Sequence, residues 1–538
     1  MPNAVESAES MRIPILLFAL AAVLFADEET APEQQPEGAG EDRVRRIAIA
    51  DAIELGLAYN LGIRSARFDA LVARLQVARE NAAWDWSLDS EFGMADTLSP
   101  SRTDLAGADV LDTQSANFVL GLTKTFREGP TLGIRWRNDR TFTNSSFASI
   151  NPAYDTNLDV SLTVPLLRGR GRAVQESGLR ASKAASEAAR WELMDRASQL
   201  IQEISNAYWN LVFLQERIRV QEKALEVAQD IERVERRKLQ PEIGRATVLS
   251  VAQAEAERLR READLISGQL DAENASDTLR RLILPFTGGP DDAVRLLAKS
   301  KLRDSVRVGL LGDLVEQALG RRNDLRKVDS DIAGFQEQVV QARDNLRIRL
   351  DLDAGVSWAS VTGTPADAVT EIFDGVAPSV RGVLRMEWPI GRREARAALR
   401  QSQLRLERAR VDRREKVNVI VSEVRLSHRT LRTTMREITV RRQELAASLV
   451  ALEGERLRLK RGSATVLDVA RLEENTVNAA LRLLQAQTVL ERSRIDVQRS
   501  AGSLLEEWQV HFDGNFKVAK RPGGPIGSST AETEAKTP

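Results

Sequence analysis

The chain has 538 residues, no cysteine and two histidines, His428 and His511. Without cysteine there can be no disulfides, thiolate metal sites or cysteine nucleophiles, and two histidines so far apart disfavour a histidine metal site or a catalytic triad. Lysine plus arginine (77) nearly balances aspartate plus glutamate (78), so no basic field points to nucleic acid as a partner.

The first predicted element is a targeting segment. Arg12 precedes an apolar run at residues 13–26, and acidic residues follow at once, which is the pattern of a secretory signal peptide. A membrane-spanning helix needs about 20 residues, so this run is too short. We predict a signal peptide at residues 1–26, starting at Met1 or Met11. The acidic segment 27–43 and the tail 511–538 are expected to be disordered.

The rest of the chain repeats itself. Residues 244–252 read GRATVLSVA and residues 462–470 read GSATVLDVA, with seven of nine positions identical. A duplication of this size predicts two related units. We place them at residues 44–290 and 312–510, joined by a linker at 291–311. Each unit is predicted to run helix, strands, long helix, tip, helix.

Each unit is predicted to contain one very long helix. Residues 172–239 and 392–461 lack proline and are rich in strong helix formers, so each helix would reach roughly 100 Å. Their narrow apolar stripes are typical of coiled coils. The shorter helices are predicted at 49–83, 246–284, 312–347 and 465–508. The summed length of one returning helix and one opening helix is close to the length of one long helix. The two shorter helices are therefore expected to stack end to end beside the long one.

Strands are predicted within residues 84–167 and 350–390. Trp84, Trp86, Leu88, Phe92 and Met94 alternate with polar residues, and the same pattern recurs in the other segments. Such segments are typical of transmembrane strands between lipid and a wet lumen; the alternative is a soluble sheet with one covered face. An additional hairpin at residues 116–142 leaves open whether each chain contributes four or six strands.

This ordered set of features resembles the TolC-like outer-membrane efflux protein family over about residues 44–510. The resemblance implies a mainly α fold with a transmembrane β-barrel portion. In that fold, long helical hairpins form a periplasmic α-barrel, and strands form an outer-membrane barrel shared by a homotrimer. The implied partners are a periplasmic adaptor protein, an inner-membrane RND or ABC transporter, and outer-membrane lipid. No enzyme activity, cofactor or metal is predicted.

The resemblance places adaptor docking at the two tips, near residues 240–247 and 461–468. Gly244 and Gly462 suit the left-handed backbone at a helix end, and Thr247 and Thr465 can cap the returning helices. The apolar docking residues are expected at the open end. They are Val248, Leu249, Val466 and Leu467.

Asp468 lies where the resemblance implies an acidic ring at the narrowest point of the pore. Three symmetry copies there would favour cations. Arg471 occupies a position where many relatives carry a second aspartate, so pairing between Asp468 and Arg471 is an alternative. A carboxylate favoured in the first turn of a helix is another, and the matching position of the first unit is Ser250.

The predicted function is therefore the exit duct of a tripartite efflux or type I secretion system. The alternative is an extracytoplasmic trimeric coiled-coil scaffold without channel activity. The exported cargo and the class of pump cannot be predicted from these residues.

Overall fold

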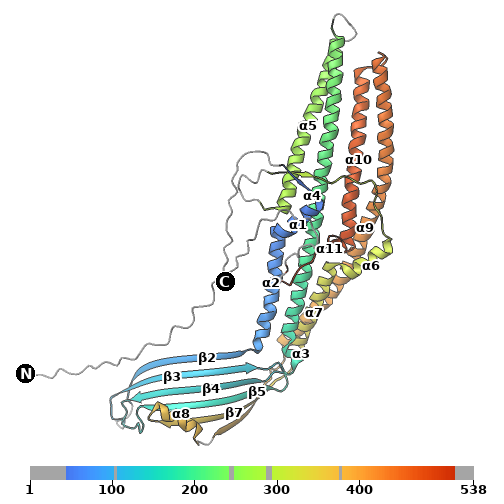
Figure 1. The fold of residues 1–538 in the computed structure, drawn as a ribbon. Coiled ribbons are helices and arrows are strands. Elements are labelled where there is room, and N and C mark those ends of the chain that lie inside the picture. The colour runs from blue at the N-terminus through green and yellow to red at the C-terminus, as the bar shows by residue number, and fades with distance from the viewer. Residues whose placement is uncertain are drawn as a thin grey trace, which may run out of the picture. The chain divides into compact units, whose positions relative to one another are not determined.

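The computed structural model describes residues 44–101, 106–240, 247–285, 294–374, 378–514 and 516. Figure 1 shows a bundle of long helices that continues into one sheet. The predicted signal peptide, the acidic linker and residues 517–538 of the predicted tail lie outside the described residues. No helix in the described ranges combines the length and apolarity needed to cross a membrane.

Two long helical hairpins dominate the described structure. The first pairs α4 (Ser177–Lys238) with α5 (Val248–Ile283), and the second pairs α9 (Arg393–Lys460) with α10 (Val466–Ser500). A separate turn, α3 (Arg172–Gln175), precedes α4. The last predicted helix is shorter than expected because Gly502, at φ 74°, separates α10 from α11 (Leu504–Glu507).

Each opening helix is broken in two, where one continuous helix was predicted. The first is α1 (Ile49–Tyr59) and α2 (Leu61–Asn81). Asn60 makes the break, because its side chain accepts hydrogen bonds from the backbone nitrogens of Gly62 (2.8 Å) and Ile63 (3.2 Å). Its amide also donates to the carbonyl of Leu282 at 3.0 Å, which ties the break to α5.

The second opening helix is α6 (Leu311–Arg321) and α7 (Asn323–Asp344), with an ionic junction at Arg322. Arg322 donates to both carboxylate oxygens of Asp324, at 2.9 and 2.7 Å, and pairs with Glu423 of α9. Lys416 approaches Asp324 at 2.8 Å. Burial opposes ionisation of Asp324, but the hydrogen bonds from Arg322 and Lys416 outweigh it and lower its pKa to about 2.

The short helices stack beside the long ones as predicted. Along α4 lie α5 and then α1 and α2; along α9 lie α10 and then α6 and α7. Contacts of α4 with α7 and α10 hold the two units together. The fold of long hairpins with strands at one end is therefore confirmed for the described residues.

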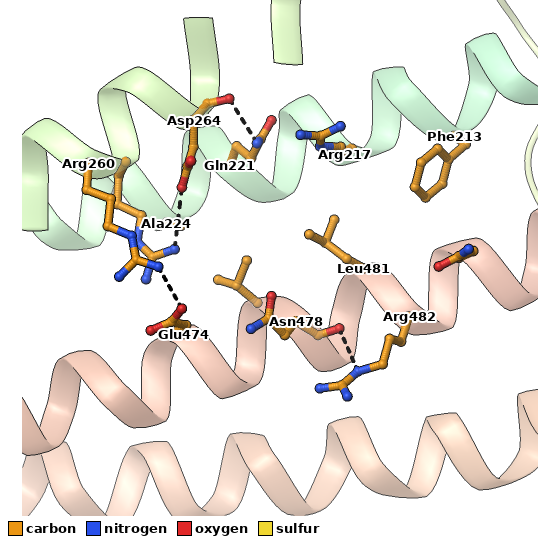
Figure 2. Close-up of a pocket in the computed structure, with 13 residues that line it drawn as sticks. Phe213, Arg217, Gln221, Ala224, Arg260, Asp264, Glu474, Asn478, Leu481 and Arg482 are labelled. Carbon is orange, nitrogen blue, oxygen red and sulfur yellow. Dashed lines mark hydrogen bonds and ion pairs between the residues drawn. The ribbon is translucent and has the colours of Figure 1, made fainter. Parts of the chain in front are cut away.

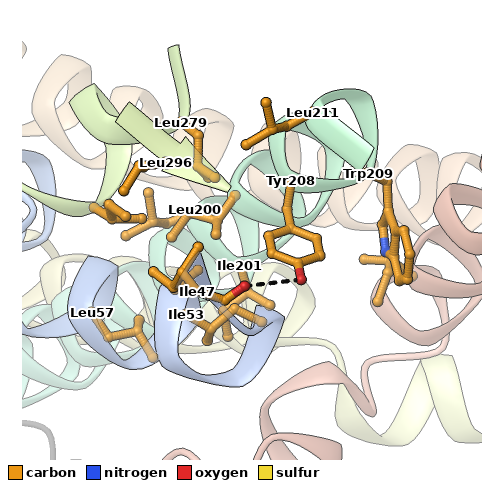
Figure 3. Close-up of a cluster of buried hydrophobic side chains, with 14 of the residues drawn as sticks. Ile47, Ile53, Leu57, Leu200, Ile201, Tyr208, Trp209, Leu211, Leu279 and Leu296 are labelled. Atoms are coloured by element: carbon orange, nitrogen blue, oxygen red, sulfur yellow. Dashed lines mark hydrogen bonds between the residues drawn. The ribbon is translucent and has the colours of Figure 1, made fainter. Parts of the chain in front are cut away.

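The largest apolar core lies at mid-height, where α1, α4, α5 and α10 meet (Figure 3). A short parallel pair, β1 (Val44–Ile47) and β6 (Arg295–Ala298), adds Ile47 and Leu296 to it, although β6 falls in the predicted linker. The hydroxyl of Tyr208 donates to the Ile47 carbonyl at 3.2 Å. Phe512 and Phe516 pack against this core, so the ordered chain extends past the predicted start of the tail.

The strands form one antiparallel sheet in the order β2-β3-β4-β5-β7-β8. The additional hairpin therefore joins the sheet as β3 and β4, and the chain contributes six strands. Trp84 does not belong to the exposed strand face, because it lies buried in a 3₁₀ turn, η1 (Ala82–Trp84), with the Arg127 guanidinium 5.0 Å from its ring centre. The strand bounds are β2 Trp86–Pro100, β3 Val110–Thr125, β4 Thr131–Thr143, β5 Ala153–Pro165, β7 Arg349–Thr362 and β8 Ser379–Glu387.

The two faces of the sheet differ in chemistry. Cross-strand partners Leu158 and Trp358 lie on the apolar face. On the other face Thr163 donates to Asp353 at 2.7 Å, and Arg385 approaches the same carboxylate at 3.4 Å. A short helix, α8 (Pro365–Phe373), packs on β5 and β7 at the end of the sheet remote from the long helices.

Candidate functional site at the hairpin tips

The second tip closes with a turn that requires glycine. Gly462 has φ 78°, and the backbone nitrogen of Ser463 donates to the Arg458 carbonyl at 3.0 Å. This six-to-one bond with a left-handed residue is the Schellman ending of a helix. The conformation predicted for Gly462 is therefore confirmed. Gly244, its counterpart at the first tip, lies outside the described residues.

Both returning helices start with the predicted threonine cap. The Thr465 hydroxyl accepts from the Asp468 nitrogen at 3.2 Å, and the Thr465 nitrogen donates to the Asp468 carboxylate at 3.0 Å. Thr247 and Ser250 exchange the same two bonds, at 3.1 and 3.2 Å. Each tip is thus a reciprocal capping box, charged in the second unit and neutral in the first.

Neighbouring donors and cations stabilise the ionised form of the Asp468 carboxylate. The hydroxyl and then the backbone nitrogen of Thr465 donate to its carboxylate, and Arg471 and Arg458 add attraction, so its pKa lies below the usual range. Arg471 is exposed and forms no ion pair with Asp468 within the described chain. The cap explains the position of Asp468, and its carboxylate remains ionised at neutral pH.

The apolar tip residues divide into exposed and buried. Val248 is 74% exposed, Leu249 67% and Leu467 48%, so all three face outward from this chain. Val466 is only 7% exposed, and its predicted presentation at the open end is wrong. It follows the cap directly and is buried within this chain, so Val248, Leu249 and Leu467 are the exposed apolar residues among the four.

The two hairpins are tied together by polar contacts between α4 and α10 near the core. Arg499 donates to Gln202 at 2.8 Å, and Gln202 donates to Asp496 at 2.5 Å. Arg492 donates to the Asn206 carbonyl and to the Asn210 side chain, both at 3.2 Å. Nearer the tips, Arg260 of α5 pairs with Glu474 of α10 at 2.7 Å.

Between these two sets of contacts lies a cleft of about 560 Å³. Figure 2 shows Phe213 and Leu481 facing each other across it and Arg260 reaching Glu474 at one end. The side chains are polar for the most part, and Gln221 is buried beside the cleft with its amide donating to the Asp264 carbonyl at 3.0 Å. Sequence reasoning missed this region because its partners lie 214 residues apart, with no local signal.

A buried carboxylate accompanies this seam. Burial raises the pKa of Glu473, even though Arg456 lies 3.1 Å away and Arg261 also attracts the charge; Glu257 raises it further. Its counterpart in the first unit, Glu255, is half exposed and pairs with Arg236 at 3.4 Å. Within the described residues, no group of three or more histidine, aspartate or glutamate side chains is placed to hold a metal ion.

Residues 314–503 match the outer membrane efflux protein family. The resemblance to outer-membrane efflux proteins is confirmed. The match covers most of the second unit, including Gly462, Thr465, Leu467, Asp468 and Arg471. None of the curated proteins matches the sequence.

Solved outer-membrane channels have the fold of this chain. The outer-membrane channel OprN is 19% identical and superposes with a TM-score of 0.62, covering 85% of this chain and 90% of that one. The CmeC outer membrane channel of Campylobacter jejuni is 16% identical, with a TM-score of 0.62 and coverage of 85% and 86%. VceC of Vibrio cholerae is 16% identical, with a TM-score of 0.62 and coverage of 84% and 96%.

Proposed function

We propose that this chain is a passive outer-membrane export channel that extends into the periplasm. The observation that carries the proposal is the six-stranded sheet with one apolar and one charged face, continuous with two long helical hairpins. Such a sheet suits lipid on one side and water on the other. The outer membrane efflux family consists of channel proteins, and the proposed role requires no chemistry from the side chains.

The proposal includes a homotrimer, because both borders of the described chain carry unpartnered apolar side chains. The sheet ends in β2 and β8, whose outward residues Phe92 and Leu384 are exposed. An open strand edge seeks another strand. The helical borders carry exposed apolar residues at coiled-coil spacing. These are Leu61, Phe68, Val72 and Leu75 on α2, Leu259, Ile266 and Leu270 on α5, and Leu404, Val411, Val419, Leu426 and Val440 on α9.

Two different borders on one chain call for head-to-tail contacts, which close into a ring when the rotation permits. We infer that β8 of one copy pairs with β2 of the next. The absence of cysteine makes the test direct, since cysteines introduced at Phe92 and Leu384 have no competitors. A bifunctional thiol reagent should give a ladder that ends at the trimer. A ladder that continues past three, or only monomers, would contradict the assembly.

Fractionation separates the channel from the scaffold alternative. A channel should remain with the outer membrane until detergent is added, and purified protein should conduct ions in planar bilayers. A scaffold has no need of an exposed aromatic strand face, and its mature chain would stay in solution without detergent. Recovery of the full chain in the soluble periplasmic fraction would overturn the channel proposal.

The exposed tips are proposed as the docking site for a periplasmic adaptor, with an RND or ABC transporter as the energy source. The support is the outward position of Val248, Leu249 and Leu467 at the ends of both hairpins. We further propose that three copies of Asp468 form the acidic constriction. In a single chain the hydrogen bonds from Thr465 lower the pKa of this carboxylate, which favours its charged form. Arg471 is exposed, so it can pair with Asp468 of a neighbouring copy or reduce the negative charge of the ring.

A further inference from the structure

The turn that joins strand to long helix is duplicated, and tip docking and strand pairing do not account for it. In the first unit it spans residues 165–172 (PLLRGRGR), and in the second residues 389–393 (PIGRR). The first begins with Pro165, the last residue of β5, and the second with Pro389, just after β8. Both contain glycines with positive φ: Gly169 at 80°, Gly171 at 92° and Gly391 at 93°. We call these two segments the junction turns.

The junction turns carry apolar side chains that the chain leaves uncovered. Ile390 is 99% exposed, and Leu167 and Trp388 are about half exposed. Leu384 and Met386 are exposed alternate residues on β8, and the exposed Trp388 and Ile390 follow at the same spacing beyond its end. The apolar strand face therefore runs without interruption into the second junction turn.

Unpaired cations lie directly beside these apolar groups. Arg168 and Arg393 are exposed and make no ion pair among the described residues. Arg170 is also exposed, and its guanidinium donates to the Leu166 carbonyl at 3.5 Å. Arg392 is held back by the Leu346 carbonyl at 3.0 Å. An aromatic ring, a bare aliphatic chain and free guanidinium groups at one level are typical of a membrane–water interface.

The opposite end of the sheet has the opposite charge. The charged residues at that end are acidic, with the exception of Arg140. They are Asp96, Asp109, Asp112, Asp155, Asp367, Glu371 and Asp374, counted over the described residues 95–101, 106–115, 140–157, 359–374 and 378–379. These acidic side chains contrast with the exposed Arg168 and Arg393 of the junction turns.

We propose that the junction turns bind the headgroups of anionic phospholipids in the periplasmic leaflet; this inference rests on the proposed membrane location of the sheet. Ile390, Leu167 and Trp388 lie at the boundary between the acyl chains and the headgroups. Arg168, Arg170 and Arg393 bind the phosphates, for which the planar guanidinium provides paired donors. The duplication gives each chain two such sites.

The test uses the full-length trimer in detergent, titrated with phosphatidylglycerol or phosphatidylcholine and followed by native mass spectrometry. The wild type should prefer phosphatidylglycerol. The double variant Arg168→Gln/Arg393→Gln should bind it roughly five times more weakly for each arginine removed, with phosphatidylcholine unaffected. The matched control Arg425→Gln/Arg429→Gln removes two exposed arginines from α9 and should change nothing. Equal affinity for both lipids, or an equal loss in the control, would overturn the proposal.

Ile390→Ser distinguishes membrane from protein as the cover of the second turn. If Ile390 contacts lipid, the trimer should persist while lipid affinity falls. Dissociation of the trimer would place Ile390 against a neighbouring copy and would count against the proposal. Failure here is separable from failure of the channel proposal: a protein that conducts ions but ignores phosphatidylglycerol refutes only the headgroup site, whereas a soluble chain refutes both.

Discussion

The returning helices of the two hairpins begin with the same capping arrangement but with different side chains. Both start their returning helix with a threonine in a reciprocal capping box, but the partner is Ser250 in the first and Asp468 in the second. The first cap, between Thr247 and Ser250, shows that a capping box at this position needs no charge. The carboxylate of Asp468 is therefore dispensable for the cap, and the second tip gains a negative charge that its geometry does not demand. The duplication supplies an internal control for every experiment on either tip.

The largest effect is expected from placing a charge on the exposed apolar tips. Leu467→Arg should abolish export and crosslinking to the adaptor, because a docked guanidinium would be desolvated without a partner. Trimers should still reach the outer membrane, since Leu467 lies far from the sheet. Leu249→Arg asks whether the first tip contributes equally. Undiminished adaptor crosslinking in both variants would refute docking at the tips.

The charge difference between the tips is tested by Asp468→Ser, which makes the second tip chemically like the first. The hydroxyl can keep the capping bonds, so trimer stability should hold. In planar bilayers, cation preference and block by multivalent cations should fall several-fold if three copies form the constriction. Arg471→Ala should keep the preference, because the acidic ring survives. Unchanged ion permeation in both variants would remove Asp468 from the gate.

The breaks in the opening helices give a second pair to compare, one neutral and one ionic. Asp324→Asn should lower the free energy of unfolding by about 1–2 kcal/mol at pH 7. The folded pKa of Asp324 is lowered to about 2 from 3.8, so its contribution is present above about pH 3.8. It is lost as the pH falls toward 2. Thermal unfolding in detergent across this range measures the effect.

Asn60→Ala is the matched control for that experiment. The substitution should lower the free energy of unfolding by about 1 kcal/mol because the cap is lost. This loss should be the same at every pH in that range. An equal pH dependence in the two variants would show that Asp324 does not contribute through its charge.

The smallest effect is expected from the buried carboxylate of the second hairpin. Burial raises the folded pKa of Glu473, so its ionisation costs stability that grows as the pH rises above its ordinary value near 4.5. Glu473→Gln should therefore raise stability slightly at pH 7.5, by less than about 1 kcal/mol, and have no effect near pH 4. Glu255→Gln, at the exposed counterpart, should be neutral throughout. Destabilisation of Glu473→Gln at pH 7.5 would mean that the pairing with Arg456 outweighs burial.

The helices, the strand faces and the threonine caps could be predicted because their signals are local. Propensity and periodicity act within a few turns, and a capping box spans four residues. The ionic break at Arg322 could not be predicted, because its partners Glu423 and Lys416 come from another helix. The Arg260–Glu474 pair and the burial of Val466 could not be predicted either, because both depend on residues distant in the sequence. At Asn60, the following Gly62 was a local cue to a new helix start that the continuous apolar pattern obscured.

The order of strands in the sheet has a consequence for how the chain is built. Strands β2 to β5 are consecutive in the chain and pair through short connections, so they can form before the rest of the chain has folded. The next pairing joins β5 to β7, as in the Thr163–Asp353 contact between residues 190 positions apart. Until the whole first hairpin has been delivered, the β5 edge stays open to any passing strand, and slow, non-local closure of this kind invites aggregation. The sheet can therefore close only after β7 (Arg349–Thr362) reaches β5.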